Sequence, residues 1–304
     1  TGYAPTGGII PCLGEAELEA RAQFIEKLRA ETEDGTYPAS VLSRKELEGM
    51  LPKVPFGPEV SGGIWSDMDG YVDPLHLMFA FRKSFVRLGG TLFAGERVSE
   101  VKSSGKGYTV VCGGRTLECG KAVLAAGLGV RKLAAQLGTD IPVFPNKSQV
   151  MLLERIPADV LPIPLLGIAR TFGGTVMIGA AHENMGMDRR LTPEVLAANA
   201  QWAVRVWPEL ERKRILRFWT GLRVWPKDAY PIYDRIPGHE NAFVFAMHSA
   251  VSLAAILEQA LPDYVMGKPL PPDGAIFGLS RFAGGGSGFQ GSAASSPHAE
   301  APNK

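Results

Sequence analysis

The order of the predicted helices and strands constrains this chain more than any other feature. A helix is predicted from residue 74, because Asp73 is a good N-cap, Pro74 suits the first helical position and apolar residues recur at helical spacing up to Gly89-Gly90. Residues 91–93 then predict a short strand. A helix that leads through two glycines into a strand is typical of the second half of a βαβ unit. This part of the chain therefore predicts a layered α/β domain.

A different pattern occupies residues 141–225. Four strands are predicted there, interrupted by one helix that starts at Thr192-Pro193: they are 149–153, 167–172, 175–180 and 215–223. Strands in succession favour an antiparallel sheet in a separate layer. Helices and strands are predicted on both sides of this region. The predicted helices are 15–32, 249–266 and one that ends at Gly138, and the predicted strands are 97–102, 108–112, 116–119, 121–127 and 242–246.

Composition and charge exclude several classes of function. The chain has 32 Lys and Arg against 31 Asp and Glu, a formal net charge of +1, which gives no electrostatic basis for binding nucleic acid or a membrane surface. No run approaches the roughly 18 to 20 apolar residues of a membrane span. Three cysteines (Cys12, Cys112, Cys119) are too few for a disulfide scaffold and lack metal-ligand spacing. We therefore predict no metal site and a reducing, cytoplasmic location.

A series of different short motifs lies along most of the chain in a defined order. They are Gly7-Gly8-Ile9-Ile10-Pro11, residues 42–47, Gly63-Ile64-Trp65, residues 69–74, Val98 to Val101, Ala125-Ala126-Gly127, residues 178–183 with Gly186, residues 219–223 with Pro226, Asp228 and Pro231-Ile232, and Arg281-Phe282. Each is weak alone. Their order and spacing resemble those of the D-amino-acid oxidase and glycine oxidase family of FAD-dependent amine oxidoreductases. Within that family, they are most similar to the flavin subunits of hydrogen cyanide synthase, opine oxidase and hydroxyproline dehydrogenase.

The resemblance implies an α/β fold (α+β overall) with two domains and FAD as the cofactor. A Rossmann-like FAD-binding domain would comprise residues 1–36, 73–138 and 236–282, and a mixed or antiparallel sheet would form the substrate domain from residues 37–72 and 139–235. Residues 283–304 are rich in Gly and Ser and predict a disordered tail.

The dinucleotide fingerprint of such a domain, G-x-G-x-x-G between a strand and a helix, is expected before Gly7 and is absent. The literal match Gly286 to Gly291 has no strand before it and is interpreted as fortuitous. The FAD-binding domain is therefore predicted to lack its first βαβ unit, whose removal would leave unpaired backbone and apolar surface. We expect an N-terminal segment or a partner subunit to supply that unit.

Two residues are implied to act on a small amine or amino-acid substrate. Arg223 matches the family's Gly-x-Arg position, where a guanidinium offers two parallel donors to a carboxylate. The alternative is an arginine in a surface ion pair. His248 follows the last strand, where the family's chain passes close to the flavin; the alternative is a hydrogen-bonded core histidine. His182 and Glu183 resemble a structural segment and lack the spacing of a zinc site.

The resemblance also implies contacts with FAD. The implied residues are Gly7, Gly8, Ile9, Val98, Ala125, Ala126, Gly127, Gly221, Met247, Ser249, Val251 and Ser252. Some depart from the family: relatives place glycine where this chain has Met247 and Ser252, and Pro145 to Gln149 replaces a more usual Arg-Gly-Gln.

Two hypotheses of different class follow. The first is an FAD-dependent oxidoreductase that oxidises an amine or amino acid to an imine, as part of a longer protein or a complex. The second is a non-catalytic structural or assembly subunit that has lost its own FAD site. An NAD-linked dehydrogenase has less support, because the Gly221-Leu222-Arg223 element resembles flavin amine oxidoreductases.

Overall fold

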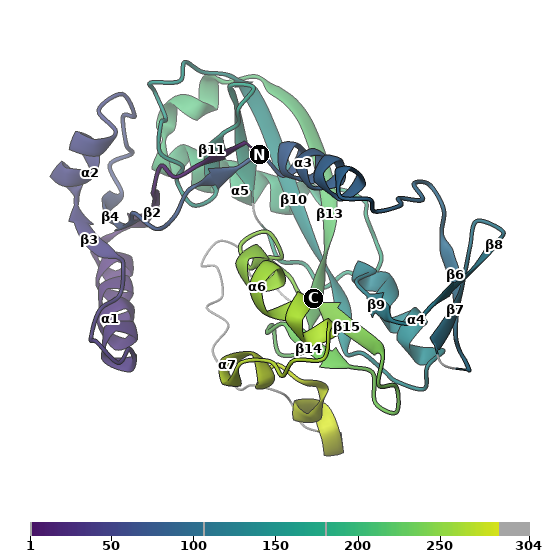
Figure 1. Ribbon diagram of the computed structural model, residues 1–304. Helices are drawn as coiled ribbons and strands as arrows, with labels where there is room; N and C mark the ends of the chain where they lie inside the picture. The colour runs from purple at the N-terminus through teal and green to yellow at the C-terminus, as the bar shows by residue number, and fades with distance from the viewer. Residues whose placement is uncertain (1, 106, 180, 286–304) are drawn as a thin grey trace.

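Two long antiparallel strands run through the centre of the computed structural model, which describes residues 2–105, 107–179 and 181–285 (Figure 1). β10 (Val143–Arg155) and β13 (Ile215–Pro226) pair from Val143 opposite Pro226 to Leu153 opposite Ile215. β12 (Thr175–Gly179) and β11 (Ile168–Arg170) extend the sheet in the order β11-β12-β10-β13, and every pair is antiparallel. The antiparallel layer predicted for residues 141–225 is confirmed.

A second group of strands continues this sheet on the left of Figure 1. β2 (Gly8–Leu13), β3 (Ser40–Ser43) and β4 (Val60–Ser66) pair in the order β2-β4-β3. Ile9 joins them to the segment before β11, because its N–H donates to the Pro164 carbonyl (3.0 Å) and its carbonyl accepts from Leu166 N–H (2.7 Å). The helices α1 (Glu15–Glu31) and α2 (Arg44–Met50) pack on β4. The predicted domain boundary after residue 36 thus lies inside one hydrogen-bonded unit.

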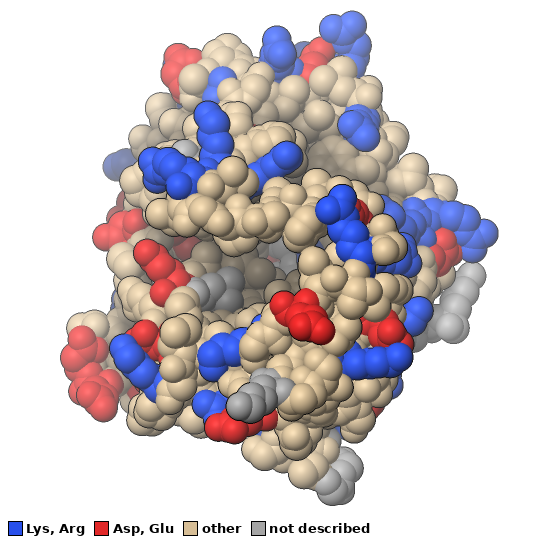
Figure 2. Space-filling view, turned by 45° about the vertical axis from the view of Figure 1, so that its right-hand side comes forward, with Lys and Arg blue, Asp and Glu red and all other residues tan. Residues whose placement is uncertain are grey.

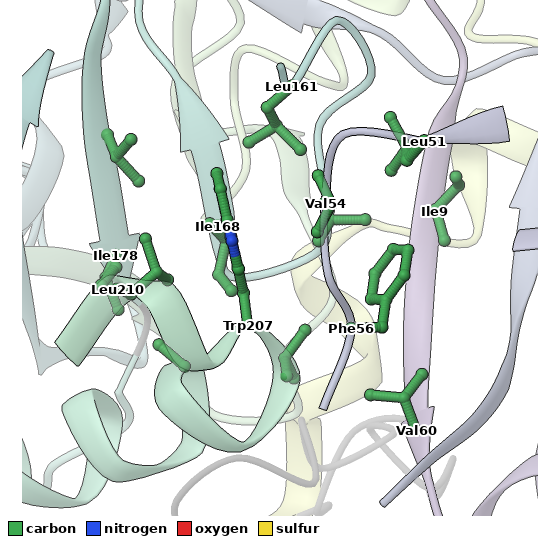
Figure 3. Close-up of a cluster of buried hydrophobic side chains, with 14 of the residues drawn as sticks. Ile9, Leu51, Val54, Phe56, Val60, Leu161, Ile168, Ile178, Trp207 and Leu210 are labelled. Carbon is green, nitrogen blue, oxygen red and sulfur yellow. The ribbon is translucent and has the colours of Figure 1, made fainter. Parts of the chain in front are cut away.

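The larger hydrophobic core lies between this extended sheet and α5 (Pro193–Val206). Figure 3 shows side chains from distant segments converging on Trp207, which is 1% exposed. The labelled members of this core are Ile9, Leu51, Val54, Phe56, Val60, Leu161, Ile168, Ile178, Trp207 and Leu210. Burial of these apolar surfaces stabilises the sheet and fixes the positions of its strands.

A smaller three-stranded sheet forms the second core. β14 (Ile232–Arg235), β15 (Ala242–Ala246) and β9 (Ala122–Leu124) pair in that order, with β15 and β9 parallel. α4 (Val130–Ala135) covers it, and the predicted meander is present as β6 (Val98–Ser104), β7 (Gly107–Cys112) and β8 (Arg115–Cys119). The predicted boundary at residue 236 falls within the β14–β15 hairpin.

β10 links the two cores. Val143 at its start belongs to the smaller core, whereas Met151 and Leu153 near its end belong to the larger one. The middle of β10, with the part of β13 that pairs with it, therefore lies between two rigid bodies of packed side chains. Such a position holds a functional side chain more precisely than a surface loop does.

Two local predictions need correction. Residues 91–93 do not form a strand: α3 (Pro74–Arg87) ends as predicted, but the segment after it has no strand beside it in the described residues, and an isolated strand cannot satisfy its backbone groups. α6 (Ala254–Val265) begins at Ala254, not at residue 249. The remaining short elements are β1 (Tyr3–Ala4), β5 (Tyr71–Val72), η1 (Gly127–Gly129), η2 (Pro208–Arg212), α7 (Pro272–Ala275) and η3 (Leu279–Gly285).

The predicted tail and the Gly286 to Gly291 motif fall almost entirely on residues 286–304, outside the described residues. None of the helices in the described ranges combines the length and apolar character that crossing a membrane requires.

Candidate functional site

Arg223 lies in the middle of β13, directly opposite Asn146 of β10. Its Nη2 donates to Ser148 Oγ (3.1 Å), and its Nη1 lies 3.0 Å from Nε2 and 3.1 Å from Nδ1 of His182. The side chain is half-buried, and burial lowers the pKa of its guanidinium. No Asp or Glu in the described part of the chain forms an ion pair with it. A desolvated cation without a counter-ion is a candidate anion-binding group.

His182 follows β12 and lies over the guanidinium. Its Nδ1 is 3.0 Å from Asn146 Oδ1, and its ring meets the Trp225 ring edge-on, with centroids 5.2 Å apart. Burial lowers the pKa of His182, with further contributions from the positive charge of Arg223 and from His248. The imidazole is therefore neutral at neutral pH.

On β10, the face opposite to Asn146 and Ser148 carries a buried polar network. Lys147 and Glu183 are 1% and 5% exposed, and Lys147 Nζ lies 3.1 Å from Glu183 Oε2. Lys147 also donates to Thr192 Oγ1 (2.7 Å) and the Arg190 carbonyl (3.1 Å), while Gln149 Nε2 donates to Glu183 Oε1 (2.7 Å). This network ties the segment 183–192 to β10.

His248, after β15, is held at both ring nitrogens. Its Nε2 lies 2.6 Å from the Ala229 carbonyl and its Nδ1 lies 2.8 Å from Ser249 Oγ. Its ring stacks on Trp225, with centroids 4.4 Å apart and planes 14° apart. Each ring nitrogen thus has a partner, and these contacts with the stacking fix the His248 ring against Trp225.

A cavity of about 640 Å³ has His248 in its wall. It is lined by Ala229, Tyr230, Pro231, Tyr233, His248, Ser249, Ser252, Leu253 and Phe277. Arg281 fixes the segment 228–231 at one wall of the cavity. Its guanidinium donates to both carboxylate oxygens of the buried Asp228 (2.8 and 3.1 Å) and to the Tyr230 and Pro231 carbonyls. Aromatic walls with a few hydroxyl groups suit a flat, partly polar ligand.

The Ala125-Ala126-Gly127 turn lies beside β13. Gly127 has φ +57°, and a Cβ there would lie 3.5 Å from Val224, the neighbour of Arg223. Gly221 faces open space, since a Cβ there would meet nothing within 4 Å. Gly127 thus lies against Val224 of β13, and Gly221 is an exposed position on the same strand.

Other residues predicted to contact FAD are packed in the protein interior or lie outside the cavity lining. Gly7 packs under the Trp65 ring and Gly8 against Asp69, while Ile9 is 1% exposed within the larger core. Val98 starts β6. Met247 is buried against Tyr233, whose hydroxyl donates to its Sδ (3.5 Å), and Val251 is exposed outside the cavity lining. Of the predicted contacts Met247, Ser249, Val251 and Ser252, only the two serines line the cavity.

Both signs of charge occur on the face of the molecule in Figure 2, and a hollow lies near its centre. Fold and side chains together define an α/β protein with a half-buried arginine, Arg223, in the middle of β13.

Comparisons with known proteins identify the family. A family model described as FAD dependent oxidoreductase matches residues 1–257, so the chain belongs to that family. It is 30% identical over 282 residues to a subunit of opine oxidase from Agrobacterium tumefaciens, covering 92% of this chain and 75% of that protein. It is 30% identical over 241 residues to hydrogen cyanide synthase subunit HcnC of Pseudomonas protegens, covering 74% of this chain and 56% of that protein.

The fold is that of known flavoproteins. The crystal structure of glycine oxidase from Geobacillus kaustophilus superposes with a TM-score of 0.82 at 23% identity, covering 92% of this chain and 76% of that one. The family resemblance and the fold class predicted from the sequence are therefore confirmed.

The described residues fit the ring end of FAD better than its diphosphate end. The cavity beside His248 offers aromatic surface and the hydroxyls of Ser249 and Ser252, and open space lies over Gly221. For a diphosphate, the described residues offer the small-residue turn that leads from β9 into η1 and α4, but no G-x-G-x-x-G between a strand and a helix.

Sequence reasoning missed the groups around Arg223. His182 lies 41 positions before it and Ser148 lies 75 positions before it. The register of β10 against β13 brings Ser148 and Asn146 to the guanidinium, and residue spacing carries no information about that register.

Proposed function

We propose that this chain oxidises a small amine or amino acid, and that Arg223 binds the carboxylate of the substrate. The observation that carries the proposal is a half-buried guanidinium that lacks an acidic partner among the described residues and lies two residues along β13 from the exposed Gly221. Burying a charge without a counter-ion is costly, and a bound carboxylate would relieve that cost through two parallel hydrogen bonds. Membership of the FAD-dependent oxidoreductases supports the reaction class.

Each residue then has a separate task. Arg223 anchors one end of the substrate and so orients its C–N bond. Trp225, held between His182 and His248, provides a rigid wall beside the guanidinium. FAD, when bound, supplies the two-electron acceptor for oxidation of the C–N bond to an imine, which water then hydrolyses. Ser249, Ser252 and the turn 125–127 are the proposed contacts for FAD.

We also propose that a further unit covers α3 and the free edge of β9. The helix has no buried residue, and its large apolar side chains include Leu75 at 68% exposed, with Leu88 just after it at 81%. β9 pairs on one side only within the described residues. An exposed apolar helix and an open parallel edge are both surfaces that a further strand and helix could cover. The occupant is a segment of the same protein or a partner; two relatives are themselves named as subunits.

The two-domain division and the cytoplasmic location belong to the same proposal. The smaller sheet with α4, α6 and the turn 125–127 would bind the cofactor, and the extended sheet would bind the substrate. All three cysteines are free thiols, two of them buried, which suits a reducing compartment.

One observation favours the alternative of a non-catalytic subunit. Ser249 adopts φ +54°, a left-handed conformation that favours glycine, and Met247 and Ser252 carry side chains where the family resemblance implies glycine. The same departures would weaken an FAD site that requires close backbone approach.

Flavin binding separates the two. The complete protein, with any segment or subunit that covers α3, should show oxidised-flavin absorbance that bleaches when its amine substrate is added. Absence of bound flavin after incubation with FAD would exclude the catalytic proposal.

Arg223 is tested by substitution. Arg223→Ala should raise KM for a carboxylate-bearing amine roughly 100-fold, because two charge-assisted hydrogen bonds contribute about 3 kcal/mol. The corresponding amide should be much less affected. Arg217→Ala, an exposed arginine on the same strand, is the matched control and should leave KM unchanged. An unchanged KM in Arg223→Ala would remove Arg223 from its role.

A further inference from the structure

The His248 ring has both of its hydrogen-bond partners on residues with an unusual backbone. Among the described residues, Ala229 (φ +65°) and Ser249 (φ +54°) are the non-glycine residues in the left-handed region. His248 Nε2 donates to the Ala229 carbonyl (2.6 Å), because a carbonyl oxygen can only accept, and Nδ1 lies 2.8 Å from Ser249 Oγ. A left-handed backbone is strained for a residue with a Cβ, and it persists only where surrounding contacts hold it.

Arg281 is the side chain that holds the backbone around Ala229. Its guanidinium donates to both carboxylate oxygens of Asp228 (2.8 and 3.1 Å) and to the carbonyls of Tyr230 (3.1 Å) and Pro231 (2.9 Å). The residues before and after Ala229 are therefore bonded to one planar group. The side chains of Arg281 and Asp228 are 9% and 0% exposed, so solvent screens these bonds little. A lysine carries its donors on a single nitrogen and cannot reproduce this fork.

His248 connects the segment 228–231 to the strand that carries Arg223. Its ring stacks on Trp225, with centroids 4.4 Å apart and planes 14° apart. Trp225 and Arg223 are two residues apart on the extended strand β13, so their side chains point to the same face. The His182 ring contacts both of them, because its centroid lies 5.2 Å from that of Trp225 and its Nε2 lies 3.0 Å from Arg223 Nη1. Contacts therefore run from the segment 228–231 to the surroundings of the guanidinium.

We propose that Arg281 is a positioning residue for the carboxylate site at Arg223. By holding residues 228–231 it fixes the His248 ring. The stack on that ring then fixes Trp225 beside the Arg223 guanidinium. A fixed ring keeps water from that side of the cation, and a less hydrated cation attracts an anion more strongly. This inference rests on the proposed role of Arg223.

The first measurement follows the Trp225 ring by fluorine NMR of the complete protein labelled with fluorotryptophan. The resonance that disappears in Trp225→Phe is that of Trp225, and its position in His248→Ala marks the ring without the stack. Arg281→Lys keeps the positive charge beside the carboxylate but removes the fork. It should move the Trp225 resonance toward the position found in His248→Ala.

Two control variants show whether the effect is specific. Arg131 also donates to both carboxylate oxygens of one acid, Asp140 (2.8 and 3.2 Å), and it has no hydrogen bond to residues 228–231 in the described structure. Arg131→Lys should leave the Trp225 resonance in place. Leu210→Ala destabilises the protein by opening a cavity in the larger core and should also leave that resonance in place.

Relief of backbone strain provides a rescue. Glycine adopts the left-handed conformation without strain. Ala229→Gly added to Arg281→Lys should therefore return the Trp225 resonance toward its wild-type position. If Arg281→Lys does not fold, Ala229→Val tests the same contacts with Arg281 in place, because a β-branched residue is more strained at φ +65° and should move the resonance.

Ligand binding connects Arg281 to the carboxylate site. Phenylacetate and its uncharged amide, phenylacetamide, are titrated into the complete protein by calorimetry. Arg281→Lys should weaken phenylacetate binding about fivefold, because water then reaches the guanidinium beside Trp225, and it should leave phenylacetamide unchanged. Ala229→Gly in the same chain should recover most of the loss.

The outcomes distinguish this inference from the proposed function. If Arg223→Ala keeps the preference for phenylacetate over phenylacetamide, the proposed function fails. If Arg223→Ala loses that preference but Arg281→Lys keeps either the wild-type Trp225 resonance or wild-type phenylacetate binding, the role of Arg281 is refuted and that of Arg223 stands. A Trp225 resonance that moves equally in Arg281→Lys with and without Ala229→Gly would also overturn the positioning role.

Discussion

Replacing Glu183 by Gln should destabilise the protein by about 3 kcal/mol. The change keeps the volume of the side chain but leaves Lys147, which is 1% exposed, charged and without its carboxylate. Removing one partner of a buried ion pair costs about 3–5 kcal/mol. We expect the lower end of this range, because Lys147 keeps its hydrogen bonds to Thr192 Oγ1 and the Arg190 carbonyl.

The measurement is urea unfolding of the complete protein, followed by circular dichroism, with the shift in midpoint multiplied by the common slope m. Glu59→Gln is the control: its partner Arg205 lies 2.6 Å away, but both side chains are about half exposed, so the loss should stay below about 1 kcal/mol. The double variant Lys147→Met with Glu183→Leu should recover most of the stability, because no buried charge remains. Equal losses for Glu183→Gln and Glu59→Gln would refute the argument that burial makes the inner pair decisive.

Three further predictions concern pH, backbone conformation and the exposed helix. The pKa of His182 in the folded protein lies below its ordinary 6.5, mainly through burial, so the unfolded chain binds the proton at a higher pH than the folded one. The free energy of unfolding should therefore fall as the pH drops below about 6.5, and it should fall less steeply in His182→Gln. Gly127→Ala, at φ +57° with its new Cβ at an ordinary 3.5 Å from Val224, should lower the unfolding free energy by about 1 kcal/mol. Gly7→Ala should lower it by several times more, because its Cβ would lie 1.8 Å from the Trp65 ring, and thermal unfolding compares the two. Phe81→Glu on α3 should reduce self-association of the chain in sedimentation experiments and weaken its assembly with the proposed covering unit, and unchanged assembly would argue against a docking role for α3.

Local elements were largely predictable because their signals are local. The N-cap at Asp73 and the proline after it predicted the start of α3, and its side chain does accept hydrogen bonds from the backbone N–H groups of Leu75 and His76. The glycine turn at 113–114 likewise predicted the β7–β8 hairpin. These signals act within a few residues, so no knowledge of the fold is required.

Predictions that depended on a distant partner were less reliable. Residues 91–93 have the composition of a strand, but a strand forms only where another backbone pairs with it. β10 was predicted to begin at residue 149 and begins at Val143, because β13 pairs with it through Pro145 and Asn146. Pairing with β13 therefore determines where β10 begins.

The amino-acid sequence alone determined the family, the mixed helix and strand content, the antiparallel layer and the identity of Arg223 as the candidate anchor. Only the tertiary structure decided what surrounds that arginine. Ser148 reaches it because of the register of β10 against β13. His182 reaches it because the neighbouring Glu183 pairs with Lys147 of β10. Register is set by pairing between segments far apart in the chain, so it emerges only when those segments pack together.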